Sequence, residues 1–98
     1  MASSNLKWHP EALAEAEAAR DWYAARSPLA ARGFLRELEG AVEAVAEAPE
    51  RWPQYFHGTR RFVFPRHYPF ALVYRTGSPV QVVAVAHTKR RPGFWLWR

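Results

Sequence analysis

The apolar residues of this chain change their spacing once, close to Pro49, and this change limits the folds available to it. Before Pro49 they recur every three to four positions, which is the spacing of a helix buried along one side. After Pro49 they form short runs rich in β-branched and aromatic residues, separated by glycine and proline. A chain of 98 residues has room for one core. We therefore predict a single α+β domain over residues 1–98.

Two helices are expected before Pro49. Pro10 suits the first turn of the first helix, and Ser27 followed by Pro28 ends that helix and begins the second. The first helix carries, at helical spacing, Leu13, Ala16, Ala19, Arg20 and Tyr23. The second helix is expected to bury Ala31, Phe34, Leu35, Leu38, Ala41, Val42 and Val45. The connection between them is short, which predicts an antiparallel helical hairpin.

Three strands are expected after Pro49, over residues 60–64, 70–75 and 80–86, with a hairpin turn at 76–79. Residues 6–8 can add a short edge strand. The middle strand alternates, so that one face carries Phe70, Leu72 and Tyr74 and the other Ala71, Val73 and Arg75. The expected order is (β)ααβββ, a helical hairpin packed on a small antiparallel sheet. Such a sheet leaves its second face available for a partner.

Charge is distributed unevenly along the chain. Residues 1–50 contain nine acidic and five basic residues, whereas residues 51–98 contain nine basic residues and no acidic one. Ordinary solvated surfaces mix the two signs, so such a run calls for an explanation. One explanation is a genome biased toward arginine. The other is a surface built for an anionic partner, either nucleic acid or an acidic protein segment.

Several classes of protein are excluded or disfavoured by composition. The absence of cysteine excludes a disulfide scaffold, a cysteine nucleophile and a thiolate metal site. His9, His57 and His67 have no second histidine at ligand spacing, so we expect no metal and no other cofactor. The N-terminal residues lack the apolar core of a secretory signal, and no apolar run is long enough to span a membrane. We expect a soluble, cytoplasmic protein.

Four segments, taken in order, resemble one known family. They are Pro10-Glu-Ala-Leu13, the helical hairpin that ends at Pro49, the strand Phe70-Ala-Leu-Val-Tyr-Arg75, and the ending Val83-Ala-Val-Ala-His87-Thr-Lys-Arg-Arg91-Pro-Gly-Phe-Trp95. From about Leu6 to Trp95 the chain resembles the ParE/RelE superfamily. These are the toxins of bacterial type II toxin–antitoxin modules, often called plasmid stabilisation proteins. The resemblance implies the fold predicted above.

The resemblance also implies partners. A cognate antitoxin is expected, with an acidic, amphipathic C-terminal segment that docks on the helical hairpin and the basic sheet face, and the two proteins would form a hetero-oligomer. ParE-type members act on DNA gyrase, whereas RelE-type members cut messenger RNA on the ribosome. RelE-type nucleases often carry a tyrosine near the C-terminus, but the matching stretch here, residues 94–97, reads Phe-Trp-Leu-Trp and has no hydroxyl. We therefore favour a ParE-like toxin that acts by binding its target over an enzyme that cleaves RNA.

Two other functions stay open at this point. If the chain is an mRNA endoribonuclease, His87 is the candidate base, and Arg61, Arg75 and Arg90 are the candidates for stabilising the phosphate. His87 is alternatively an ordinary strand-end histidine held by a backbone hydrogen bond. The third function is a non-toxic nucleic-acid or protein-binding module on the same scaffold.

A larger set of residues is predicted to contact the target or the antitoxin: Arg60, Arg61, Arg66, Arg75, His87, Lys89, Arg90, Arg91 and Trp95. Arg60 and Arg61 should point to opposite faces, so only one of them can join Arg75. Arg75 could instead pair with a helix glutamate such as Glu43 or Glu47. Trp95 and Trp97 either dock the C-terminal segment onto the domain or anchor a partner.

Overall fold

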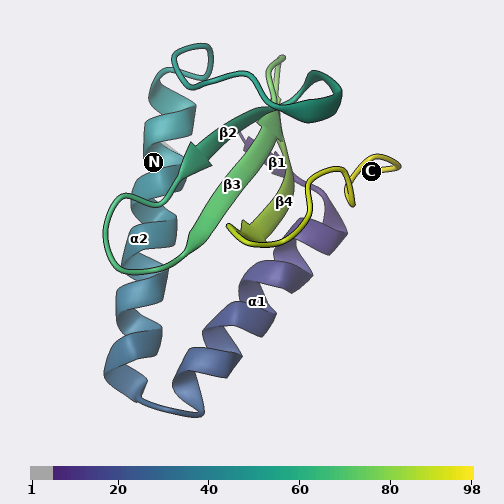
Figure 1. The fold of residues 1–98 in the computed structure, drawn as a ribbon. Coiled ribbons are helices and arrows are strands. Elements are labelled where there is room, and N and C mark those ends of the chain that lie inside the picture. Colours follow the sequence, from purple (N-terminus) through teal and green to yellow (C-terminus); the bar gives the residue numbers. More distant parts are fainter. Residues whose placement is uncertain (1–5) are drawn as a thin grey trace.

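The computed structural model describes residues 6–98, which form a helical hairpin lying on one face of a four-stranded sheet (Figure 1). The elements, in order, are β1 (Leu6–Trp8), α1 (Pro10–Ala24), α2 (Pro28–Glu47), β2 (Arg60–Val63), β3 (Phe70–Arg75) and β4 (Val80–His87), with a short 3₁₀ turn at Phe56–Gly58 ahead of β2. This confirms the predicted α+β class and the order (β)ααβββ.

The sheet has the strand order β1-β4-β3-β2. The last three strands form the predicted antiparallel meander. β1, however, pairs in parallel with β4, with Leu6 opposite Val80 and Trp8 opposite Val82, so the sheet is mixed and not wholly antiparallel. A parallel pair needs a long crossover connection, and the helical hairpin and the meander that separate β1 from β4 in the chain supply it.

Both helices begin where proline and a capping side chain predict. Pro10 and Pro28 each occupy the first turn, where the missing N–H costs nothing. The Ser27 hydroxyl accepts the N–H of Ala30 at 3.3 Å, as expected for an N-cap serine. The cap of α1 is His9, whose Nδ1 accepts the N–H of Glu11 at 3.1 Å.

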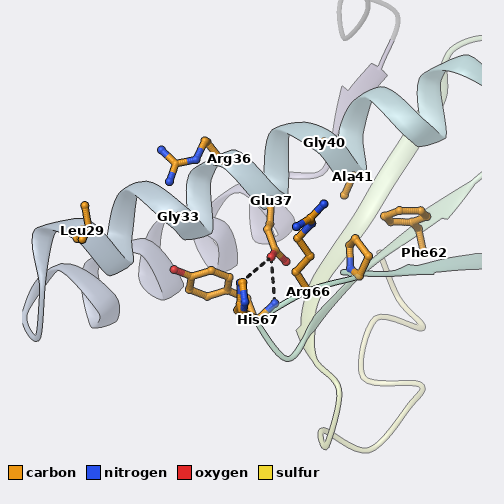
Figure 2. Close-up of a pocket in the computed structure, with 11 residues that line it drawn as sticks. Leu29, Gly33, Arg36, Glu37, Gly40, Ala41, Phe62, Arg66 and His67 are labelled. Carbon is orange, nitrogen blue, oxygen red and sulfur yellow. Dashed lines mark hydrogen bonds and ion pairs between the residues drawn. The ribbon is translucent and has the colours of Figure 1, made fainter.

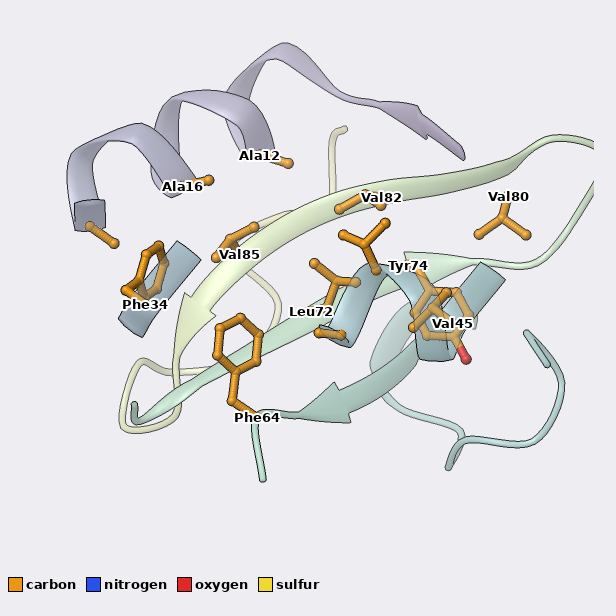
Figure 3. Close-up of a cluster of buried hydrophobic side chains, with 13 residues drawn as sticks. Ala12, Ala16, Phe34, Val45, Phe64, Leu72, Tyr74, Val80, Val82 and Val85 are labelled. Carbon is orange, nitrogen blue, oxygen red and sulfur yellow. The ribbon is translucent and has the colours of Figure 1, made fainter. Parts of the chain in front are cut away.

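The main core lies between the hairpin and the sheet (Figure 3). Phe34 and Val45 of α2 pack against Leu72 and Tyr74, so this face of β3 points toward the helices. The stripe predicted for α1 is wrong at Leu13, which is 48% exposed. α1 buries small residues, Ala12, Ala16 and Ala19, and their size lets the helix lie close to β4. Arg20 is exposed as well, and so is Leu35 of α2.

The second face of the sheet is partly covered by the C-terminal segment, residues 88–98. Trp95 is 1% exposed, packs with Val73 and Ala84, and stacks on Tyr55 with ring centroids 5.4 Å apart. An irregularity in the β3–β4 register brings Val83 to the same cluster. The expectation that this whole face is free for a partner is therefore wrong. Of the two tryptophans, Trp95 docks the segment and Trp97 projects from it, 92% exposed.

Candidate functional site

The strand register separates Arg60 from Arg61. Arg61 lies opposite Val73, on the face that also carries Arg75, which we term the outer face. Arg60 lies opposite Tyr74, on the helix side, where its guanidinium donates to the main-chain oxygen of Trp52 at 2.7 Å. Arg61 is therefore the residue of this pair that shares a face with Arg75.

Three of the four candidate nuclease residues converge on one shallow depression of the outer face. Arg61, His87 and Arg90 line it together with Trp95, and its volume is only about 10 Å³. Tyr55 forms another part of the wall; its hydroxyl accepts from Arg61 at 3.2 Å, and the Arg61 guanidinium lies 4.4 Å from its ring centroid. Sequence reasoning missed Tyr55, because nothing in a proline-rich loop indicates which side chain returns to the sheet.

The fourth candidate, Arg75, does not line this depression. Its guanidinium donates to the main-chain oxygen of Arg98 at 3.2 Å, so it holds the C-terminal segment. The alternative of a pair with Glu43 or Glu47 is wrong too, because within residues 6–98 neither glutamate forms an ion pair.

His87 is exposed at the end of β4. Its Nδ1 accepts the N–H of Lys89 at 3.1 Å, and its ring packs edge-on against Phe70 with centroids 5.4 Å apart. This is the backbone hydrogen bond expected of an ordinary strand-end histidine. Because Nδ1 is occupied as an acceptor, only Nε2 is left to exchange a proton with a ligand.

Glu15 of α1 links the acidic half of the chain to the basic half. Its carboxylate accepts from Arg98 at 2.8 and 3.0 Å, and Arg90 approaches it at 3.5 Å. It also accepts the N–H of Val85 at 3.0 Å, while Arg98 donates to the carbonyl of Val83 at 3.0 Å. These two side chains therefore cap the edge of β4 beyond the point where β1 ends.

A groove of about 570 Å³ opens beside this capped edge, between α1 and the ends of β3 and β4; we term it the edge groove. Its lining is largely apolar, with His87, Arg90 and Glu15 as its polar members; the other residues are Ala18, Ala19, Trp22, Tyr23, Pro69, Phe70 and Val85. Trp22 is 53% exposed, with the Arg26 guanidinium 3.5 Å from its ring centroid. The pKa of Tyr23 is raised above its ordinary value, mainly by burial and further by the nearby Tyr68.

A second pocket of similar volume lies between α2 and the β2–β3 loop (Figure 2). On its floor, Glu37 accepts the main-chain N–H of His67 at 3.0 Å, and the His67 imidazole lies 3.8 Å from the same oxygen. Arg66 lines this pocket, so the structure places it apart from the cations of the outer face.

Lys89, Arg91 and Arg66 are exposed and form no ion pair within residues 6–98. In the same range, no three histidine or carboxylate side chains gather closely enough to hold a metal ion. None of the helices between Leu6 and Arg98 combines the length and the apolar character that a bilayer span requires.

The comparison with protein families decides among the possible relatives of this fold. The family model described as the ParE toxin of the type II toxin–antitoxin system, parDE, matches residues 6–92. The chain belongs to the ParE toxin family. As a ParE-family member it is the toxin component of a type II toxin–antitoxin system, and the resemblance seen in the sequence is confirmed.

Among solved structures, the ParE-family chain is similar to one described as the chromosomal ParDE TA system from P. aeruginosa. The TM-score is 0.72 and the sequence identity is 22%, with 89% of this chain and 98% of that chain covered. At this identity the likeness shows that the fold is shared. No curated protein matches the chain.

Proposed function

We propose that this ParE-family toxin inhibits DNA gyrase by binding it, and that a cognate antitoxin neutralises it within a hetero-oligomer. The observation that carries the proposal is the family match over residues 6–92. The charge pattern supports it, because residues 51–98 contain nine basic residues and no acidic residue. Such a positive surface suits a target that holds DNA, and it suits an acidic antitoxin equally well.

Two features of the outer face support action by binding over cleavage of a bond. A nuclease needs room for the scissile phosphate, a base for the 2′-hydroxyl and an acid for the leaving oxygen. The depression lined by Arg61, His87 and Arg90 has a volume of about 10 Å³, far less than a nucleotide requires. Residues 94–97 of the C-terminal segment contribute no hydroxyl, and the Tyr55 hydroxyl that lines the depression accepts a hydrogen bond from Arg61.

We assign the antitoxin segment to the edge groove. Ala18, Trp22 and Phe70 offer it an accessible apolar surface. His87 and Arg90 line the same groove and can meet acidic side chains. An amphipathic acidic segment matches both properties, with its apolar side in the groove and its carboxylates toward the rim.

A filling substitution tests this assignment. Ala18 lines the edge groove and is exposed, so Ala18→Trp should obstruct the groove without disturbing the core. Ala14→Trp is the matched control, because Ala14 is exposed on the same helix and does not line the groove. When the toxin is co-purified with the product of the neighbouring gene, Ala18→Trp should lose the complex and Ala14→Trp should keep it. Equal retention by both variants would place the antitoxin elsewhere.

Induction of the chain in a bacterial host, with separate readouts of DNA damage, translation and RNA integrity, tests the proposed target. We expect growth arrest with DNA damage, while translation continues and mRNA stays intact. Codon-linked cuts in ribosome-bound message would instead establish the RelE-type activity. Normal growth with abundant folded protein would favour the non-toxic binding module.

A further inference from the structure

The C-terminal segment and the loop before β2 form one continuous surface on the outer face. Tyr55 stacks on the buried Trp95, and His57 lies against Gly93, where an added Cβ would stand 3.3 Å from the His57 Nε2. Gly93 has a φ of +99°, a conformation that favours glycine, so this close approach is built into the backbone. Arg98, paired with Glu15, ties down the far end of the segment.

Two large aromatic side chains project from this surface. Trp97 is 92% exposed and Phe56 is 52% exposed, whereas Trp95 and Tyr55 pack in the cluster on the outer face. A tryptophan that is almost wholly in solvent gains nothing for folding, because it buries almost no apolar area. The ring is therefore accessible to a partner.

Three cations belong to the C-terminal segment that carries Trp97, and a fourth, Arg61, lines the depression beside it. Lys89 and Arg91 are exposed without an ion pair within residues 6–98, and both belong to the same segment as Trp97. Arg61 and Arg90 line the small depression, and each has donors to spare beyond its bond to Tyr55 or Glu15. We call the surface made by Phe56, Arg61, Lys89, Arg90, Arg91 and Trp97 the tail face.

We propose that the tail face binds single-stranded nucleic acid without sequence preference. The four cations would contact successive phosphates, and Trp97 and Phe56 would stack on bases. Proteins that bind single-stranded nucleic acid without sequence preference combine these two kinds of contact. This binding goes beyond the inhibition of gyrase proposed above, and it does not depend on it.

The shape of the tail face favours nucleic acid over an acidic peptide. A peptide gains affinity by burying side chains in pockets, and the depression on this face, at about 10 Å³, is too small for one. Stacking needs only an exposed ring and no pocket. The grooves that suit a peptide lie elsewhere, beside α1 and α2.

The test titrates the full purified chain into a fluorescein-labelled oligothymidylate and follows anisotropy over a series of salt concentrations. We expect the logarithm of the association constant to fall linearly with the logarithm of the salt concentration. The slope should be about −2 to −3, as three or four phosphate contacts on a single strand predict. Trp97→Ala should weaken it about tenfold. Trp22→Ala, which removes a half-exposed tryptophan from α1, should leave it unchanged.

A charge-matched pair of double variants separates this site from general attraction to a basic protein. Lys89→Gln with Arg91→Gln should reduce the salt slope by about 1.4. Arg32→Gln with Arg36→Gln, which removes the same charge from exposed positions of α2, should not change it. The proposal is overturned if the oligonucleotide does not bind at low salt, or if both tryptophan variants or both double variants behave alike. Binding of polyglutamate but not of oligothymidylate would also overturn it, in favour of an acidic protein partner.

Discussion

Glu15 and Arg98 lie 83 positions apart in the chain and form a two-pronged ion pair, with Nη1 and Nη2 of the arginine 3.0 and 2.8 Å from the two carboxylate oxygens. Both side chains are largely buried, at 17% and 13% exposure. The pair fastens the C-terminal segment to α1 and caps the open edge of β4. The position of the C-terminal segment, and with it of the tail face, therefore depends on a residue in the first helix.

Replacement of Glu15 by alanine should destabilise the fold. It leaves the Val85 N–H without an acceptor and leaves the Arg98 guanidinium only the Val83 carbonyl, in a poorly hydrated place, so we expect a loss of about 2–3 kcal/mol in the free energy of unfolding. Urea denaturation measures this. Glu17→Ala, at an exposed position on the same helix, should change the value by less than about 0.5 kcal/mol. Similar losses for the two variants would argue against the pair.

Substitution of the two tryptophans of the C-terminal segment should have very different effects on stability. Trp95→Ala empties a packed site between Tyr55 and the sheet and should cost about 3–5 kcal/mol. Trp97→Ala removes a ring that contacts mostly water and should stay within about 0.5 kcal/mol of the parent. Thermal or urea unfolding distinguishes the two, and a large loss for Trp97→Ala would contradict the described position of its ring.

Gly33 and Gly40 both lie in α2, yet alanine should have opposite effects at the two positions. A Cβ at Gly33 would collide with the Tyr68 hydroxyl, which donates to the main-chain oxygen of Ala30 at 2.7 Å. Gly33→Ala should therefore cost about 1–2 kcal/mol, through displacement of Tyr68. Among residues 6–98, and apart from the adjoining backbone of α2, no atom lies within 4 Å of a Cβ at Gly40, so Gly40→Ala should stabilise the helix by about 0.5–1 kcal/mol. The difference between the two unfolding free energies checks the α2 packing.

Stability should fall in alkali because of buried tyrosines. Burial raises the pKa of Tyr74 above its ordinary value of 10.0, although the nearby Arg60 opposes the shift. The unfolded chain then loses its phenol proton before the folded chain does. The stabilising contribution is complete below about pH 10 and is lost as the pH rises through the folded pKa. Urea melts over this range should show a smaller decline for Tyr74→Phe than for the parent, although the variant also loses its hydrogen bond to Pro49. Parallel declines would exclude Tyr74 as the cause.

His87→Ala should leave growth arrest intact, because the histidine ends a strand and bonds to the backbone of Lys89. Colony counts after induction measure this, with soluble expression verified for each variant. Loss of arrest in a variant that still folds and still binds the antitoxin would instead give His87 a role in the toxic action.

Local signals predicted the helices well. Ser27 and Pro28 mark the start of α2 because capping and the fixed φ of proline act within a few residues. The burial of Leu13 and Leu35 was predicted wrongly for a physical reason. Helical spacing predicts which residues share one side of a helix, but the element that packs against the helix determines which side is buried. In α1 it is the alanine side that packs against β4.

The direction of β1 and the composition of the outer face had no local signal. The depression that joins Tyr55, Arg61 and His87 forms only when the proline-rich loop and the C-terminal segment fold back over the sheet. Arg66 and Arg61 look equivalent in the sequence, yet they lie at different sites, because a turn carries Arg66 toward α2. The absence of carboxylates after Glu50 predicted the basic character of the second half. It did not predict that one glutamate, Glu15, would pair with two of its arginines.

The most direct test of the proposed activity is a supercoiling assay with purified gyrase, relaxed plasmid and ATP. With increasing toxin, we expect loss of supercoiling and accumulation of gyrase-bound, cleaved DNA, with recovery when the antitoxin is added first. Unchanged supercoiling and no trapped cleavage at saturating, correctly folded toxin would contradict gyrase as the target.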